Sequence, residues 1–265
     1  MKSTDILKLI PSVLVTVGII MLWYDDFIAV LIMSLGFYIT IPALIAAIVI
    51  FFLSIKMNTV GKKVIVFYGI FNILLLAAYI LFVSPHRQCS PEIMEKHYEK
   101  HAAELDELCR FAFEALDDSC AVTLEWEHGK LDMFHVESHG ECDNCWNEEA
   151  IVKQDSLMQI VGLTKEELDG IRKRLKKAGC IGIEVSSTTP HNVAVWFRRV
   201  GMGRYDYMIK DTALTEEEKA EVMDSSGDLI PYNERVVFRY GGGAIGPQVF
   251  GKEEREEYMS KHKAW

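Results

Sequence analysis

The stretch Val193–Ile209, VAVWFRRVGMGRYDYMI, carries the pattern from which the fold of the polar part of the chain follows. Two runs rich in β-branched and aromatic residues, 193–200 and 204–209, flank Gly201-Met202-Gly203. Such runs on either side of a glycine pair predict two strands joined by a turn. A third strand is expected over 180–186, before the Thr-Pro-His-Asn turn at 189–192. We therefore expect an antiparallel meander.

Helices and a hairpin are expected around this meander. Thr164 and Thr215 each precede a glutamate by three residues, which is the pattern of a capping box. Alternating apolar residues also predict a hairpin around His128-Gly129. The sequence thus predicts an α+β domain over 90–265 with a mainly antiparallel sheet. Its expected elements are a long helix over 91–116, strands over 121–127 and 131–137, a helix over 165–178, the meander, a helix from 216, a strand over 235–240 and a helix over 252–262.

The first 84 residues differ in character. Three apolar stretches, at about 6–24, 27–55 and 64–83, each approach or exceed the ~20 residues that a helix needs to cross a bilayer. They predict a three-helix transmembrane anchor over 1–84, and Asn72 is expected to form a hydrogen bond across a helix interface.

Basic residues in the short loops predict an orientation for this anchor. Asp25 and Asp26 occupy the first loop, whereas lysines precede the first stretch and follow the second. Lysine and arginine favour the cytoplasmic side. The pattern predicts a bacterial inner-membrane protein with a cytoplasmic N-terminus and a periplasmic C-terminal domain. The lysines are Lys2, Lys8, Lys56, Lys62 and Lys63.

Charge is unevenly divided along the chain. The residues up to Cys89 carry a net charge of +3, and the remainder carries −13. A strongly acidic domain repels the phosphate backbone of nucleic acids, which argues against nucleic-acid binding. The same charge favours a basic protein as partner.

All six cysteines lie at or after position 89, which is typical of an exported domain with disulfides. The pair Cys142-Asp143-Asn144-Cys145 is open to three interpretations: a structural disulfide, a redox-active pair, or a zinc site completed by His135 and His139. The disulfide candidates are Cys89, Cys109, Cys120, Cys142, Cys145 and Cys180.

Two further motifs resemble functional sites but lack their context. His97 and His101 are one helical turn apart, yet no glutamate follows His97, so a solvated helix face is expected. Gly241–Gly246 satisfies G-x-G-x-x-G after a strand, but Pro247 follows in place of a helix start. We expect a structural turn or a partner contact there and no nucleotide. No catalytic constellation and no cofactor are predicted.

The segment Ile230–Pro247, IPYNERVVFRYGGGAIGP, resembles a segment of uncharacterised small bacterial proteins. Some of these proteins are encoded in toxin and immunity gene neighbourhoods. The resemblance implies an immunity protein, and it assigns no catalytic residue.

These observations together predict a non-enzymatic inner-membrane protein whose periplasmic domain binds a protein partner. A basic toxin is one such partner, in which case the chain is an immunity protein against an envelope-acting antibacterial effector. The alternative is a periplasmic thiol-redox or zinc-binding protein that uses Cys142 and Cys145. The expected partner-contact residues are Glu216, Glu217, Glu218, Gly241, Gly242, Gly243, Glu253 and Glu254.

Overall fold

The computed structural model divides the chain into two compact units, Met1–Gln88 and Cys89–Trp265. Each unit is described by itself. The described residues are 9–24, 37–55, 60–79, 89–116, 120–138, 141–186, 192–200, 203–241 and 249–262.

The first unit contains three described helices, α2 (Ile10–Tyr24), α4 (Phe37–Ile55) and α5 (Val60–Ala78). A buried asparagine joins two of them. Asn72 Nδ2 on α5 donates to the Ser12 carbonyl on α2 at 3.0 Å, and Thr16 Oγ1 donates to Asn72 Oδ1 at 2.6 Å. The hydrogen bond expected of Asn72 across a helix interface is confirmed.

The predicted transmembrane anchor is wrong, because none of the helices within the described residues combines the length and the apolar character that a membrane span requires. Of the stretch predicted at 27–55 the structure describes a helix of 19 residues, and of that at 6–24 one of 15 residues. The inner-membrane location and the cytoplasmic and periplasmic sides derived from this anchor are corrected with it.

The apolar residues of this unit are divided between a small core and an exposed surface. Ile19, Ala47 and Ile65 are buried, whereas Phe52 and Leu74 are among many large apolar side chains that are exposed.

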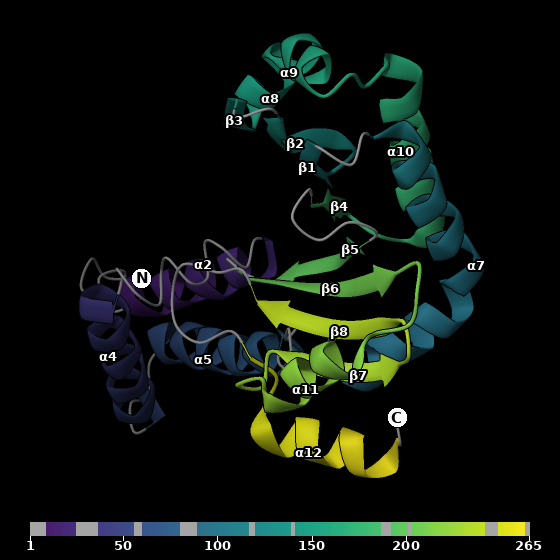
Figure 1. Ribbon diagram of the computed structural model, residues 1–265. Helices are drawn as coiled ribbons and strands as arrows, with labels where there is room; N and C mark the ends of the chain where they lie inside the picture. The colour runs from purple at the N-terminus through teal and green to yellow at the C-terminus, as the bar shows by residue number, and fades with distance from the viewer. Residues whose placement is uncertain are drawn as a thin grey trace. The chain divides into compact units, whose positions relative to one another are not determined.

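An eight-stranded sheet forms the centre of the second unit (Figure 1). The strand order is β3-β2-β1-β4-β5-β6-β8-β7, and every pairing is antiparallel. The strands are β1 (Cys120–Glu127), β2 (Lys130–Ser138), β3 (Glu141–Trp146), β4 (Gly182–Val185), β5 (Asn192–Val200), β6 (Gly203–Lys210), β7 (Leu229–Asn233) and β8 (Val236–Gly241). The predicted meander corresponds to β4, β5 and β6.

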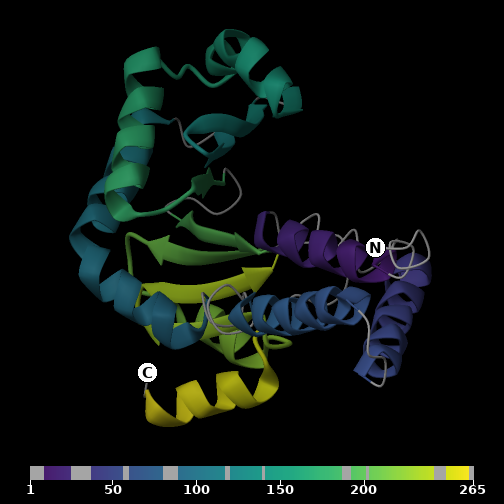
Figure 2. The ribbon, with the colours of Figure 1, turned by 180° about the vertical axis from the view of Figure 1, so that it is seen from behind.

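Helices cover one face of this sheet and its two ends. The long helix α7 and the helix α10 lie side by side along one face, as both views show (Figures 1 and 2). Short helices α8 and α9 accompany β2 and β3, and α11 and α12 accompany β7. The bounds are α7 (Pro91–Ala115), α8 (Glu148–Val152), α9 (Gln154–Ile160), α10 (Lys165–Ala178), α11 (Glu216–Asp224) and α12 (Lys252–Lys261).

The main hydrophobic core lies between α7, α10 and the sheet. From α7 it receives the fully buried Met94, Leu105, Leu108 and Ala112, which recur at helical spacing along one stripe. The sheet contributes alternate residues of its strands, among them Val195 of β5.

Local sequence determines where several elements begin and end. Both capping boxes are present, with Thr164 Oγ1 accepting from the Glu167 N–H and Thr215 Oγ1 from the Glu218 N–H. Gly179 ends α10 at φ 68°, in the left-handed region that glycine favours.

Two strands were not predicted, and both lie at edges of the sheet. The residues of β3, Glu-Cys-Asp-Asn-Cys-Trp, have little intrinsic strand preference, and the sequence predicts a loop there. Pro231 argues against a strand in β7 except at an edge, which is where β7 lies. Both segments are therefore strands because of their neighbours: β3 pairs with β2, and β7 pairs with β8.

Candidate functional site

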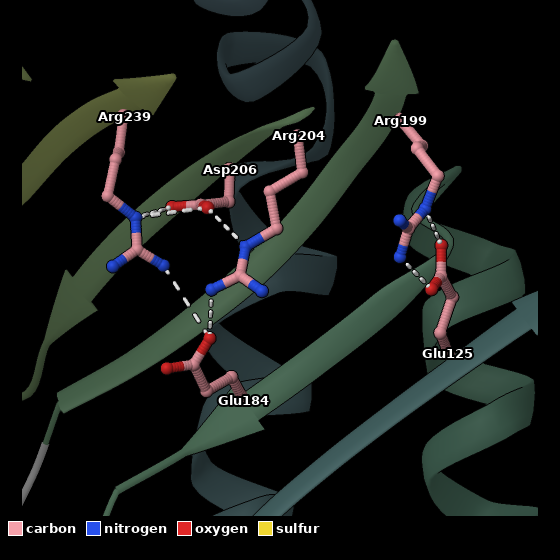
Figure 3. A network of polar contacts seen from close by, with 6 residues as sticks. All are labelled: Glu125, Glu184, Arg199, Arg204, Asp206 and Arg239. Carbon is pink, nitrogen blue, oxygen red and sulfur yellow. Dashed lines mark hydrogen bonds and ion pairs between the residues drawn. The ribbon is translucent and has the colours of Figure 1, made fainter. Parts of the chain in front are cut away.

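The sheet face opposite α7 and α10 carries a network of charged side chains (Figure 3). Asp206 of β6 lies between Tyr205 and Tyr207, which join the helix-side core, so its carboxylate points to the other face. Arg239 Nε of β8 donates to Asp206 at 2.9 Å, and Arg204 Nε donates to it at 3.2 Å. The Asp206 side chain is completely buried.

Further ion pairs extend the network across the sheet. Glu184 of β4 binds Arg204 and lies 3.6 Å from Nη2 of Arg239. Glu125 of β1, also buried, binds Arg199 of β5 through both carboxylate oxygens. Burial would lower the pKa of Arg239, but Asp206 and Glu184 hold it above its ordinary value. Three guanidinium groups thus face three carboxylates, and these ion pairs join strands of the sheet.

Trp196 lies beneath this network. Its indole is fully buried, and the Arg204 guanidinium carbon stands 4.1 Å from the ring centroid, within cation–π range. The ring covers Gly182 of the adjacent β4, where a Cβ would meet Cε3 of the indole at 3.0 Å and the Leu124 carbonyl oxygen at 2.6 Å. A glycine is therefore required for this close approach.

His97 packs between α7 and the sheet, so the solvated helix face expected for this histidine is wrong. Its ring centroid lies 4.4 Å from that of Phe197 and 4.7 Å from that of His101. Nδ1 is 2.9 Å from the Tyr207 hydroxyl. Burial lowers the pKa of His97 to about 4, helped by His101, Arg198 and Lys100, while the Ala178 carbonyl acts in the opposite direction. The imidazole is neutral near pH 7.

The predicted disulfides are wrong, because no two of the six described cysteines are joined. Cys142 is exposed, and the other five are buried. Burial raises the pKa of Cys180 to about 12 and also raises the pKa values of Cys109 and Cys145. Buried thiols of this kind behave as small apolar groups.

Cys142 and Cys145 both lie on β3, but their side chains are on opposite faces of the sheet. Side chains three residues apart on a strand point to opposite faces. Cys145 accordingly lies opposite Phe134 on the core side, whereas Cys142 lies opposite the exposed Glu137. This geometry does not allow the two sulfurs to bind one zinc ion or to form a reversible disulfide. No group of three or more potential metal ligands occurs within the described residues, and His139 lies outside them.

Exposed apolar side chains concentrate at β3 and α8. Trp146, Ile151 and Val152 are 43%, 47% and 82% exposed, within seven residues of chain. In the described part of this unit, Met223 is the one other large apolar residue with comparable exposure. Clustered exposed apolar residues of this kind mark contact sites.

The structure places the predicted acidic contact residues on two helices near β7. Glu216 and Glu217 of α11 and Glu253 of α12 are exposed. Glu218, in contrast, caps α11 and binds Lys210, so its role is structural. Glu254 is partly buried near the start of α12.

The glycine segment lies mostly outside the described residues. Gly241 ends β8, and a Cβ at this position would meet nothing within 4 Å. Gly242 and Gly243, like the rest of residues 242–248, are not described. Of the predicted contact residues, the structure brings the two acidic helices next to each other, because Arg255 of α12 donates to the Val222 carbonyl of α11 at 3.3 Å.

Sequence reasoning missed the exposed residues of β3 and α8 and the network around Asp206. The exposed residues could have been noticed in the sequence, because the apolar Trp146, Ile151 and Val152 stand next to acidic residues. The second depends on strand register, which brings residues 125, 184, 199, 204, 206 and 239 together.

Comparison with known proteins found no matching family model, no similar curated protein and no similar solved structure.

Replacing Asp206 by asparagine should destabilise the second unit. The change removes the carboxylate that Arg239 and Arg204 share and leaves two guanidinium groups poorly compensated, at a cost of about 3 kcal/mol. Urea unfolding of Asp206→Asn measures this loss. Glu216→Gln, at an exposed ion pair, should cost less than about 1 kcal/mol. Equal effects of the two substitutions would show that the network does not support the sheet.

Stability should fall on acidification because of His97. Its folded pKa of about 4 lies below the unfolded value of 6.5, so the unfolded chain binds more protons between these values. The stabilisation is complete above pH 6.5 and decreases as pH falls towards 4, by at most about 3 kcal/mol. In unfolding measurements across this range, His97→Gln should show a shallower slope than the unmodified protein. His128→Gln, at the exposed hairpin turn, is the control.

Thiol titration should distinguish Cys142 from the other cysteines. In the folded protein, a thiol reagent should modify one cysteine rapidly, and Cys142→Ser should remove that reaction. In denaturant without reductant, all six should react. Fewer than six reactive thiols in denaturant would restore the disulfides that the structure lacks.

Proposed function

We propose that the Cys89–Trp265 unit is a non-enzymatic protein-binding unit that contacts a basic partner through β3 and α8. The observation that carries this proposal is the exposure of Trp146, Ile151 and Val152 at one end of an otherwise polar surface. Tryptophan is strongly enriched among residues that dominate binding energy at interfaces.

Charge near this surface favours a basic partner. Glu137, Glu148 and Glu149 are exposed around β3 and α8, and Asp143 is partly exposed. Lys153 is a nearby cation, and it already binds Glu149 at 2.9 Å and Asp143 at 3.6 Å. The acidic excess attracts a positively charged protein and accelerates its association. A toxin, the partner that the resemblance of residues 230–247 implies, meets this description when its surface is basic.

The ionic network supports binding and is not a reaction centre in this proposal. Arg199, Arg204 and Arg239 each bind a carboxylate, so these groups hold the sheet rigid. A rigid surface loses little conformational entropy when a partner binds.

Site-specific crosslinking tests this function. A photoreactive residue replaces Ile151 in the full-length chain, and the same residue replaces Met223 as the control, because the two side chains are equally exposed. We expect Ile151 to yield a discrete adduct with one basic protein, and Met223 to yield none.

Two further measurements test whether the crosslinked adduct reflects binding at this surface. Trp146→Ala should reduce its yield about tenfold, as removal of an anchor residue does. Raising the salt concentration should reduce the association rate of the purified partner, because exposed charges are screened over about 8 Å at physiological ionic strength. Identical adducts from both labelled positions would refute the proposed surface.

A further inference from the structure

The two edges of the eight-stranded sheet are built differently. At one edge, β7 is only five residues long, contains Pro231 and has an irregular register between Pro231 and Asn233. Helices α11 and α12 also pack against it. Short length, proline, bulges and covering helices are the means by which proteins prevent an edge from pairing with another chain.

The opposite edge, β3, lacks the proline and the irregular register, and the helix that packs against it, α8, is only five residues long. The strand contains neither proline nor lysine, and its six residues pair with β2 without a shift in register. Glu141–Trp146 therefore presents a regular strand whose register with β2 is unbroken.

The hydrogen-bond pattern shows which backbone groups of β3 face outward. The Asn147 N–H donates to the Asp132 carbonyl at 2.6 Å. Because bonded pairs alternate along an antiparallel ladder, Cys145 and Asp143 also direct their N–H and C=O groups towards β2. Those of Cys142, Asn144 and Trp146 then point away from the sheet. Within the described residues, no backbone hydrogen bond to these outward groups is formed from another segment.

We infer that β3 receives an extended segment of the basic partner as a ninth strand of the sheet. This inference rests on the proposed function and specifies how the partner binds. Main-chain hydrogen bonds to Cys142, Asn144 and Trp146 supply affinity, and the side chains beside the edge supply specificity.

The charges beside β3 determine which kind of strand can be added at this edge. Lysine or arginine at alternate positions of the incoming strand meets Asp143 on one face of the sheet, and the apolar residues between them contact the exposed part of Trp146 on the other face. A second copy of this chain would instead bring the same acidic residues against themselves, at an unfavourable electrostatic energy. The partner segment is thus extended, basic and partly apolar.

A synthetic peptide tests the strand addition directly. The probe is an octapeptide of alternating lysine and valine, added to the full-length chain, with amide hydrogen exchange as the readout. We expect protection of the amides of Cys142, Asn144 and Trp146. The same peptide with N-methyl groups on alternate residues cannot complete the ladder and should give no protection. An octapeptide of alternating glutamate and valine should bind at least tenfold more weakly.

Paired substitutions of Asn144 provide an independent check. Asn144→Pro removes an outward N–H and leaves the bonds between β2 and β3 in place, so it should weaken peptide binding at least tenfold. Asn144→Ala keeps the N–H and should change binding less than about twofold. The exchange rates of the β2 amides verify that both variants remain folded.

The remaining outcomes overturn the inference in different ways. Binding without protection of these three amides would place the peptide elsewhere. Protection in the chain alone that disappears on dilution would show that a second copy occupies the edge. If no peptide binds while Ile151 still crosslinks to a basic protein, strand addition fails and the proposed function stands. Failure of the crosslink with retained peptide protection would instead refute the proposed function.

Discussion

Burial of one face of the sheet under α7 is the interaction on which the second unit depends. Met94, Leu105, Leu108 and Ala112 form a continuous apolar stripe against strands from the middle of the sheet. Each large apolar side chain removed from water contributes about 1.5–3 kcal/mol before conformational entropy is subtracted. Helix α10 extends the same layer, and its C-terminal glycine allows His97 of α7 to lie close by. Without this layer, the alternating strands would have no common face to bury.

On the opposite face of the sheet, stability depends on the balance between the desolvation energy of buried charges and the energy of their ion pairs. Buried ionic groups cost desolvation energy and are tolerated only when hydrogen-bonded partners compensate them. Asp206 meets this condition through two arginines, and Glu125 meets it through Arg199. Because ion pairs require defined geometry, the network also selects the register of β4, β6 and β8.

The difference between the two edges connects the fold to recognition. At β7, proline and two helices leave little access to the backbone. At β3, the outward backbone groups, Trp146 and the acidic residues around them are close together in the chain and share one edge. Main-chain pairing is strong only when the receiving strand is already held in place. The β2–β3 ladder and the buried Cys145 provide that support.

The sequence by itself determined the elements that depend on nearby residues. The hairpin at His128-Gly129, the capping boxes at Thr164 and Thr215 and the left-handed stop at Gly179 involve contacts within a few residues, so their patterns are readable directly. Tertiary structure alone decided β3 and β7, the separation of Cys142 from Cys145, and the meeting of Asp206 with Arg239. These features depend on which strands pair and in which register, and that choice arises from burying a common apolar face.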